Sequence, residues 1–394
     1  MKFKRVIILI LDSVGCGVQP DYKKYHKEKC DTLGNIYKNQ NNFHLPNLEK
    51  IGLKKILFGN QRNNCIAGKM IQMGKGNDTF AGVWEMFGSI FKKRFRSEKK
   101  GFSLEIIKKI NSSLNINIVG NEYISGFKAL DKYYKEHIKK VSPILYLADD
   151  GVVLLAAHEK IIKPILLNKM GKRIVSILKN QNISRVITRP FIGQPLNFIR
   201  TDNRKDFLAI KDLNDNSILD LLKQKKIKLL TTEHLYNLLG NHSVIDHIKG
   251  NLDNSELIKV IIKSLQEYNK RSVLLFCLQD FDMFGHKKDV NGYAKDLIRF
   301  DKKLPSIIKS LNKEDLLIIT ADHGCDPTVK LRNHTREYVP VILYSKSLKT
   351  NIDLGIRSTF ADIGQTICYN FNLPNLKNGI SLLDLKKIIN KRID

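Results

Sequence analysis

Three things are scarce in this 394-residue chain: acidic residues, cysteine pairs and long apolar runs. No apolar run approaches the roughly 18 residues that a membrane-spanning helix needs, so we expect no membrane segment. The six cysteines form no CxxC pair, and a chain of this length does not need disulfides to support a core, which favours a reducing cytoplasm. The basic start and residues 6–11 imitate a signal peptide, but the apolar run ends at Asp12 without a small-residue cleavage site. We interpret residues 6–11 as a buried first strand.

The shortage of acidic residues leaves 67 basic against 39 acidic side chains and a formal net charge of +28. Such a balance occurs in proteins that bind nucleic acids or anionic surfaces. No recognisable nucleic-acid motif accompanies the charge here. We therefore interpret it as a lysine-rich, solvated surface and expect no nucleic-acid partner.

The length predicts two to three domains at about 150 residues each. Hydrophobic residues make up 42% and charged residues 27% of the chain, as in globular proteins. Short runs rich in Val, Ile and Leu alternate with amphipathic helical patterns, which indicates an α/β fold whose largely parallel sheet lies between helices. The predicted strands of this sheet are residues 6–11, 273–278, 316–320 and 339–344, and the predicted helices include residues 257–268 and 294–311.

The middle of the chain has its own alternating pattern, preceded by a basic stretch at 92–101 that we interpret as a linker. The strands of the large sheet lie on both sides of it in sequence. We therefore predict a smaller α/β domain, residues 93–208, inserted into a core formed by residues 1–92 and 209–394. Its predicted elements are strands 144–147, 152–156 and 185–188 and helices 104–114, 126–139 and 161–180.

Acidic residues follow three of the predicted core strands directly: Asp12, then Asp280 and Asp282, then Asp322. In open α/β sheets the ligand crevice lies at the carboxyl ends of the strands. One Asp after a strand is common in turns, but three such sites predict carboxylates that converge.

Three histidines accompany these carboxylates: His286, His323 and His334. Three carboxylates and three imidazoles suit two divalent ions such as Mn²⁺ or Zn²⁺, whereas Ca²⁺ and Mg²⁺ prefer oxygen ligands. Any one histidine alone is better explained as a helix cap or a partner of a core carbonyl. The set as a whole predicts a metal site.

A glycine-rich stretch, residues 74–79, leads into a helical pattern at 80–87. Asn77 or Asp78 is a suitable N-cap, and the free N–H groups of a helix start bind phosphate well. A Thr79 hydroxyl placed against two metal ions would be a nucleophile or phosphate carrier. The equally weighted alternative is that Thr79 only completes the cap.

Arginines gather in the middle block at positions 189, 200 and 204, after an acidic turn that contains Asp150. Guanidinium groups suit a phosphate, and an Asp suits sugar hydroxyls. Taken alone, these residues are better explained as a solvated charged loop.

Together these segments resemble phosphopentomutase, a metal-dependent family of the alkaline phosphatase superfamily. The resemblance extends over nearly the whole chain, and ADHGCDPT at 321–328 followed by HTREYVP at 334–340 is its most specific part. The other matching segments are residues 11–17, 31–34, 45–48, 78–85, 189–193, 203–204, 280–282 and 360–366.

The resemblance implies an alkaline-phosphatase-like core with an inserted cap domain, and an enzyme that interconverts ribose 1-phosphate (or deoxyribose 1-phosphate) and ribose 5-phosphate (or deoxyribose 5-phosphate). Thr79 would carry the phosphoryl group, and a sugar bisphosphate would load it initially. Two Mn²⁺ ions are implied, with Zn²⁺ or Mg²⁺ as possible replacements, and we expect a cytoplasmic monomer that acts on a small phosphosugar. One ion would be held by Asp282, His286 and His334 and the other by Asp12, Asp322 and His323, while Asp150, Arg189, Arg200 and Arg204 would face the pentose phosphate.

Several positions depart from the family pattern, mostly on the substrate side. Asp282 and His286 are four residues apart where the family usually has five. These departures leave open a mutase for another phosphosugar and a metal-dependent phosphatase or phosphodiesterase. From another class, the basic charge leaves open a non-catalytic nucleic-acid-binding protein. The substituted positions are Asn77 (usually Lys), Val83 and Lys205 (usually His), Ala148 (usually Ser), Asp149 (usually Ala) and Glu233 (usually basic).

Overall fold

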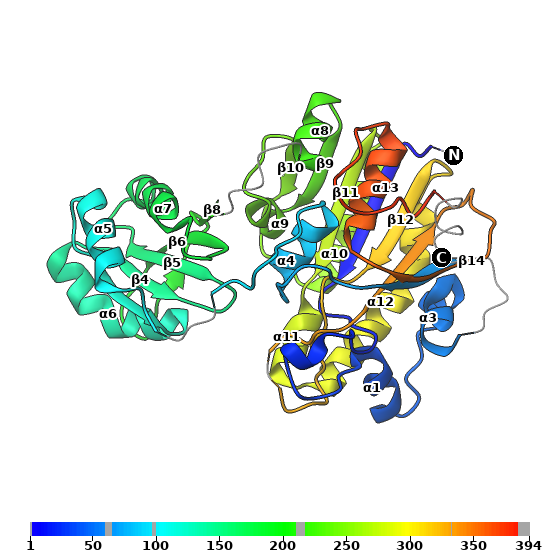
Figure 1. Cartoon of the computed structure of the whole chain (residues 1–394), viewed down its shortest axis with the longest axis horizontal. Helices are drawn as coiled ribbons and strands as arrows, with labels where there is room; N and C mark the ends of the chain where they lie inside the picture. The colour runs from blue at the N-terminus through cyan, green and yellow to red at the C-terminus, as the bar shows by residue number, and fades with distance from the viewer. Residues whose placement is uncertain (1, 60–64, 97–99, 210–216, 332, 385–394) are drawn as a thin grey trace. The chain divides into compact units, whose positions relative to one another are not determined.

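The computed structural model describes residues 2–59, 65–96, 100–209, 217–331 and 333–384 (Figure 1). The chain divides into two compact units. We call Met1–Lys92 with Asp215–Asp394 the larger unit and Lys93–Asn214 the smaller unit.

The larger unit is built on an eight-stranded sheet with the order β10-β9-β11-β1-β12-β13-β2-β14. Every residue of the three central strands, β11, β1 and β12, is buried, so both faces of the sheet are covered there. The strands are β1 Arg5–Leu11, β2 Ile66–Met70, β9 Lys228–Thr232, β10 Ile245–Ile248, β11 Ser272–Leu278, β12 Asp315–Thr320, β13 Val339–Tyr344 and β14 Ile352–Arg357.

The predicted largely parallel sheet is confirmed, with β13 as the exception because it runs antiparallel to both β12 and β2. The described residues of the connection from β12 to β13 form no helix, so the chain returns beside β12 instead of crossing over to a parallel position. This connection carries His323 and His334.

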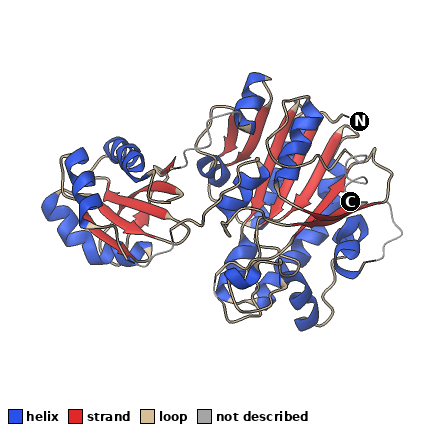
Figure 2. Cartoon of the chain, in the orientation of Figure 1, coloured by secondary structure: helices blue, strands red, loops and turns tan. Residues whose placement is uncertain are grey.

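Helices cover the sheet in two groups: α10, α11 and α12 pack together, and α13 packs with α4 (Figure 2). The α-helices are α1 Thr32–Asn39, α2 Pro46–Leu48, α3 Lys54–Phe58, α4 Thr79–Met86, α8 Ile218–Gln224, α9 Glu233–Leu238, α10 Asn254–Glu267, α11 Asp280–Lys287, α12 Val290–Ser310 and α13 Ala361–Phe371, with a 3-10 turn at Tyr22–Lys24 and a π-helical turn at Glu49–Leu53.

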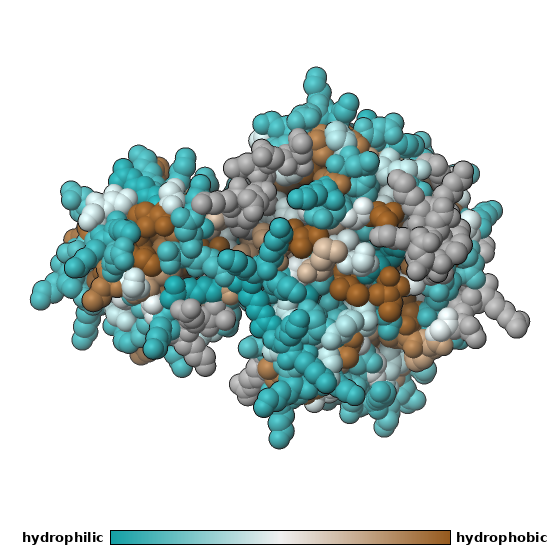
Figure 3. Space-filling model, viewed as in Figure 1, coloured by the Kyte–Doolittle hydropathy of each residue, from teal (hydrophilic) through white to brown (hydrophobic). Residues whose placement is uncertain are grey.

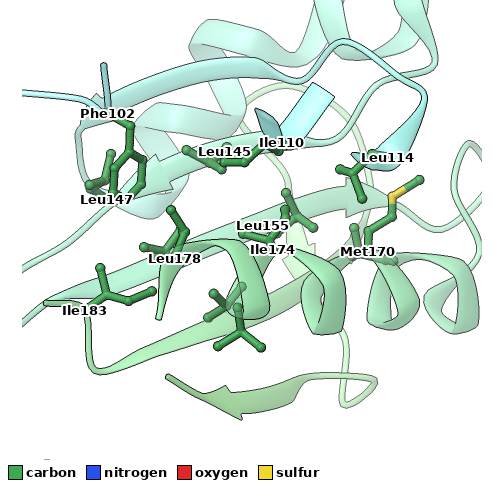
Figure 4. Packing of buried hydrophobic residues seen from close by; sticks show 14 of the residues in the cluster. Phe102, Ile110, Leu114, Leu145, Leu147, Leu155, Met170, Ile174, Leu178 and Ile183 are labelled. Carbon is green, nitrogen blue, oxygen red and sulfur yellow. The ribbon is translucent and has the colours of Figure 1, made fainter. Parts of the chain in front are cut away.

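The smaller unit has its own sheet, with the order β3-β4-β5-β6-β7 and β8 paired with β6. Its β4 strand alternates: Leu145 and Leu147 belong to one apolar cluster, and Ile144 and Tyr146 to the other. The first of these clusters is shown in Figure 4, so the unit buries a core of its own. Its elements are β3 Val119–Tyr123, β4 Ile144–Leu147, β5 Val152–His158, β6 Arg185–Ile192, β7 Ile199–Arg200, β8 Lys205–Leu208, α5 Leu104–Leu114, α6 Gly126–Lys140 and α7 Pro164–Leu178.

The visible surface of each unit is mainly hydrophilic, and small hydrophobic patches lie among the hydrophilic residues of that unit (Figure 3). None of the described helices combines the length and the apolar character needed to cross a bilayer. All six cysteines are buried, and each is a free thiol.

Candidate active site

The carboxyl ends of the three central strands bring distant residues together. Leu11 of β1 pairs with Leu278 of β11, and Ile10 pairs with Thr320 of β12, so the three strands end at one level. The chain that leaves these ends carries Asp12, Asp282 and Asp322.

The first ligand set consists of Asp12, Asp322 and His323, which are all buried and whose ligand atoms lie within 4.8 Å of one another. The His323 Nε2 atom is 3.4 Å from Asp12 Oδ1 and 3.5 Å from Asp322 Oδ2. The other oxygen of each carboxylate is held by the protein. Asp322 Oδ1 accepts the backbone N–H groups of Ser13 and His323, each at 3.1 Å, and Asp12 Oδ2 accepts the Cys277 thiol at 3.3 Å.

The second ligand set surrounds Asp282. This residue and His286 lie four apart on α11, and the spacing puts them on one helical face with Asp282 Oδ2 3.2 Å from His286 Nε2. The family's usual spacing of five is therefore not needed for these side chains to meet. His334 Nε2 lies 3.7 Å from Asp282 Oδ1 and 3.1 Å from His286 Nε2.

A short antiparallel bridge explains why the two loop histidines meet. Gly324 and Thr335 exchange backbone hydrogen bonds of 3.2 and 2.7 Å, which joins the two loop segments that carry His323 and His334. Their ring centroids are 4.2 Å apart. The structure thus brings together all six side chains that we expected to bind metal.

The carboxylates of this cluster bury an excess of negative charge, and this charge shifts the pKa values of neighbouring groups. The pKa of Asp12 is raised by burial and then by the charges of Asp322 and Asp282. Burial alone would lower the pKa of His323, but the same two carboxylates outweigh it and raise this pKa. The pKa of His334 is lowered to about 4 by burial and by the neighbouring His323, which leaves a neutral imidazole suited to metal binding.

Three buried oxygens in the cluster have no hydrogen-bond partner: Asp12 Oδ1, Asp282 Oδ1 and Asp322 Oδ2. A buried polar atom without a partner costs about 1–3 kcal/mol. Each of these oxygens instead faces a histidine Nε2 atom. The Nδ1 atom of His323 is hydrogen-bonded to the Gly324 carbonyl at 3.2 Å, and this bond turns the Nε2 atom of the same ring toward the carboxylates. This mixture of oxygen and nitrogen ligands fits divalent metal ions.

Thr79 is the first residue of α4, and its Oγ1 atom lies 3.3 Å from His323 Nε2. The N-cap of α4 is Asp78, whose side chain accepts the Ala81 N–H at 3.1 Å. The Thr79 hydroxyl is therefore beside the carboxylate and imidazole cluster, and the capping bond is supplied by its neighbour.

Close packing fixes α4 against this cluster. A Cβ atom on Gly82 would lie 2.5 Å from the Asp322 carbonyl oxygen, so only glycine allows the helix to come this near. Asn77 Nδ2 donates to the His334 carbonyl at 3.0 Å. Glu85 accepts the N–H groups of Met73 and Gly74 at 2.8 and 2.7 Å, which ties the glycine-rich stretch to the helix.

Sequence reasoning missed Arg336, which is 1% exposed and anchors the same stretch. Its guanidinium donates to the Gly76 carbonyl at 3.0 Å and to the Gln72 carbonyl at 2.6 Å, and it pairs with Asp21. The HTREYVP segment indicated only the family resemblance. The burial of its arginine could not be predicted, because a residue in a loop has no periodic pattern of burial.

Asp326 and Glu337 form a further buried group with Cys30, but their carboxylates already have partners. Glu337 accepts the Thr32 N–H and hydroxyl, both at 2.8 Å, and Asp326 accepts the Asp31 N–H at 3.0 Å. These side chains hold the start of α1.

The smaller unit holds the three arginines expected to face a phosphate. The pKa of Arg189 is lowered to about 10 by burial and then by the charges of Arg204 and Arg200, and its buried Nε atom has no hydrogen-bond partner. Arg204 is engaged with Asp206 at 2.7 and 2.8 Å, and Arg200 lies 4.5 Å from the centroid of the Phe127 ring. These arginines form a local excess of positive charge.

The remaining positions that depart from the family pattern lie in different elements. Asp149 belongs to the acidic turn between β4 and β5, together with Asp150. Asp150 adopts a left-handed backbone conformation, with φ of 58°, and Asp149 and Asp150 both contribute to the raised pKa of Tyr123 after burial. Val83 is fully buried in α4, Lys205 begins β8, and Glu233 begins α9 and accepts the Gly250 N–H at 2.9 Å.

The Metalloenzyme superfamily model matches residues 4–375. A phosphopentomutase of Clostridium kluyveri is 39% identical over 398 residues, which cover 98% of this chain and 100% of the relative. A phosphopentomutase of Caldanaerobacter subterraneus subsp. tengcongensis is 40% identical over 388 residues, which cover 96% of this chain and 97% of the relative. Among solved structures, a phosphoglycerate mutase of Leishmania mexicana is similar at 11% identity with a TM-score of 0.49, over 97% of this chain and 97% of the mutase. On these sequence relatives and the family model, the chain belongs to the phosphopentomutase family of the metalloenzyme superfamily.

Proposed function

We propose that the chain interconverts ribose 1-phosphate, or deoxyribose 1-phosphate, and the corresponding 5-phosphate through a phosphorylated Thr79. The observation that carries the proposal is the position of the Thr79 hydroxyl, 3.3 Å from His323 Nε2 in a cluster of three carboxylates and three imidazoles. The family membership supports the pentose phosphate as substrate.

Two divalent ions, proposed to be Mn²⁺, would occupy the cluster. Asp282, His286 and His334 would hold one ion, and Asp12, Asp322 and His323 the other. The three buried oxygens without partners support bound cations. The ligand atoms of Asp12, Asp322 and His323 lie within 4.8 Å of one another, and the Nε2 atoms of His286 and His334 lie 3.2 and 3.7 Å from the Asp282 oxygens. Such ions neutralise the charge on the transferring phosphoryl group and hold the attacking and leaving oxygens in line.

The protein's own part in the reaction centres on Thr79. In the proposed cycle, phosphorylated Thr79 gives its phosphoryl group to the free hydroxyl of the sugar phosphate: the bond from phosphorus to Thr79 Oγ1 breaks, and a bond to the sugar oxygen forms. The resulting 1,5-bisphosphate then returns its other phosphoryl group to Thr79 Oγ1. The proton lost by the sugar hydroxyl in the first transfer is matched by the proton gained by the other sugar oxygen in the second. A sugar bisphosphate loads Thr79 at the start.

The residues of the smaller unit are proposed to recognise the sugar phosphate, with residues 93–208 as the cap domain of the family. Arg189, Arg200 and Arg204 would bind the phosphate that is not being transferred, and Asp150 a sugar hydroxyl. The excess of positive charge around the partly buried Arg189 side chain supports an anionic ligand. The six buried free thiols support a cytoplasmic location.

The test is to incubate the Mn²⁺-loaded protein with ribose 1-phosphate and a catalytic amount of bisphosphate, and to follow ribose 5-phosphate and free phosphate. Isomer without free phosphate supports the proposal, whereas free phosphate alone identifies a hydrolase. Thr79→Ala is expected to abolish turnover and to leave the melting temperature and the bound metal unchanged. Thr79→Ser, the matched control, keeps a hydroxyl and should retain part of the turnover. Full activity of Thr79→Ala would show that another residue carries the phosphoryl group.

A further inference from the structure

The thiol of Cys325 lies in the wall of the metal centre. Its sulfur is within 4.8 Å of the ligand atoms of Asp282 and His286, and the residue is fully buried. The backbone N–H of Cys325 donates to the Ser13 carbonyl at 3.1 Å, which fixes the residue beside the loop that follows β1.

Helix α11 passes directly over this thiol at Gly285. A Cβ atom on Gly285 would lie 2.7 Å from the Cys325 sulfur, so the glycine leaves the space that the sulfur occupies. The thiol donates to the Asn333 carbonyl at 4.0 Å, the outer limit for a bond to sulfur. The thiol is thus held close to two metal ligands by packing and is only weakly bonded elsewhere.

Two ligand sets therefore share Asp282. One contains Asp282, His323 and His334, and the other contains Asp282, His286 and Cys325. The first offers oxygen and nitrogen, which Mn²⁺ accepts, whereas the second adds sulfur, which soft ions such as Cd²⁺ and Zn²⁺ bind strongly.

We infer that Cys325, with Asp282 and His286, forms an alternative, sulfur-containing ligand set that a thiophilic divalent ion occupies in preference to the set of Asp282, His323 and His334. On binding, the S–H bond of Cys325 breaks, its proton leaves to solvent, and a bond from sulfur to the ion forms. The centre thus distinguishes ions by softness: a hard ion is held without Cys325, and a soft ion is drawn toward α11. This inference concerns the ion that is held and is independent of which sugar is converted.

The test is a titration of the metal-free, full-length protein with Cd²⁺ while the ultraviolet cadmium–thiolate charge-transfer band is followed. The wild type should develop the band, and Cys325→Ser and Cys325→Ala should lose it. Loss of an outer partner of a metal ligand already costs about 10–100-fold in affinity, so loss of the sulfur ligand should weaken Cd²⁺ binding by at least about tenfold. Binding of Mn²⁺ to the same variants, followed by electron paramagnetic resonance, should change little.

The matched control is Cys277→Ser, because Cys277 is also buried and its thiol contacts the proposed metal ligand Asp12. It should keep the cadmium band. A band that survives in both Cys325 variants, or that disappears in Cys277→Ser alone, would overturn the inference. X-ray absorption at the cadmium edge of the wild-type protein provides a readout that needs no variant, and absence of a sulfur neighbour there would also overturn it.

The outcome is separable from the proposed function. A cadmium band that depends on Cys325 in a protein without mutase activity supports this inference and contradicts the proposed function. Mutase activity with Mn²⁺ but no cadmium–sulfur bond would support the proposed function and contradict this inference.

Discussion

At the scale of single residues, Arg336 connects two parts of the candidate site. It lies two residues after His334 and donates to carbonyls of the stretch that leads to Thr79. Its planar guanidinium also stacks over the Tyr25 ring at 4.6 Å, and its backbone N–H donates to His26 Nε2 at 2.8 Å. A lysine ammonium has no fork of donors with which to reach all of these partners at once. We therefore expect Arg336 to act as a positioning residue.

We expect Arg336→Lys to lower kcat by about 10²-fold, since displacing a reacting group by about 1 Å has an effect of this order, and to change KM little. Single-turnover phosphorylation of Thr79 by a sugar bisphosphate should slow in parallel. Arg5→Lys is the matched control, because Arg5 is an equally buried arginine paired with Asp315, at the opposite end of β1 from Asp12. If both variants lose stability but only Arg336→Lys loses kcat, positioning is supported; equal kcat in the two variants would leave Arg336 a structural role only.

At the scale of secondary-structure elements, the approach of α4 to the loop after β12 sets where the Thr79 hydroxyl lies. The contact is between helix backbone and loop backbone at Gly82, so no side-chain rearrangement can absorb an added methyl group.

Gly82→Ala should therefore displace α4 from Asp322. We expect a loss of activity of at least about 10²-fold, together with about 1–3 kcal/mol of stability from overpacking. Kinetic assay and denaturant unfolding measure the two effects. Ala81→Gly in the same helix is the control, since it costs about 1 kcal/mol of helix propensity without adding an atom. Comparable activity losses in both variants would attribute the effect to helix stability and not to the position of Thr79.

The elements that sequence could predict are those whose burial is uniform. Strands β1, β11 and β12 are covered on both faces and appear as continuous apolar runs. Strand β2 was not predicted, because Gly68 and Lys69 interrupt it; a Cβ atom on Gly68 would lie 2.4 Å from the Gly355 carbonyl oxygen of β14. Strand β14 is an edge strand with exposed positions, and β9 and β10 at the other edge are short. These features depend on neighbours that no local pattern reveals.

The residues of the candidate site also divide into those that sequence could predict and those that it could not. The carboxylates could be predicted because each follows a strand that was itself predictable, and His286 because it lies one helical turn from Asp282. The side chains that position them could not. Cys325 and Arg336 belong to the connection between β12 and β13, whose course is set by contacts with distant segments and has no period.

At the scale of the whole molecule, the cluster of three carboxylates and three histidines is a source of instability unless its charge is balanced. Asp12 and Asp322 are 3% and 0% exposed, and mutual repulsion adds to the cost of burial in raising the pKa of Asp12. Buried charges of one sign are costly without compensation. Bound cations would supply that compensation, so the free energy of unfolding of the larger unit should depend on metal.

Removal of metal with a chelator should lower the melting temperature, and Mn²⁺ should restore it, since a ligand at 100 times its Kd stabilises the folded state by about 2.7 kcal/mol. Fluorescence of Trp84, the single tryptophan, is a suitable probe because this residue is buried in α4 of the larger unit and no tryptophan lies in the smaller one. Asp322→Asn is the discriminating variant: the asparagine oxygen can still accept the N–H groups of Ser13 and His323, while one buried charge is gone. The metal-free variant should therefore melt above the metal-free wild type and gain less from Mn²⁺. A wild-type melting temperature that does not respond to chelation, or an Asp322→Asn variant that is stabilised by Mn²⁺ as much as the wild type, would mean that these carboxylates do not hold the ion.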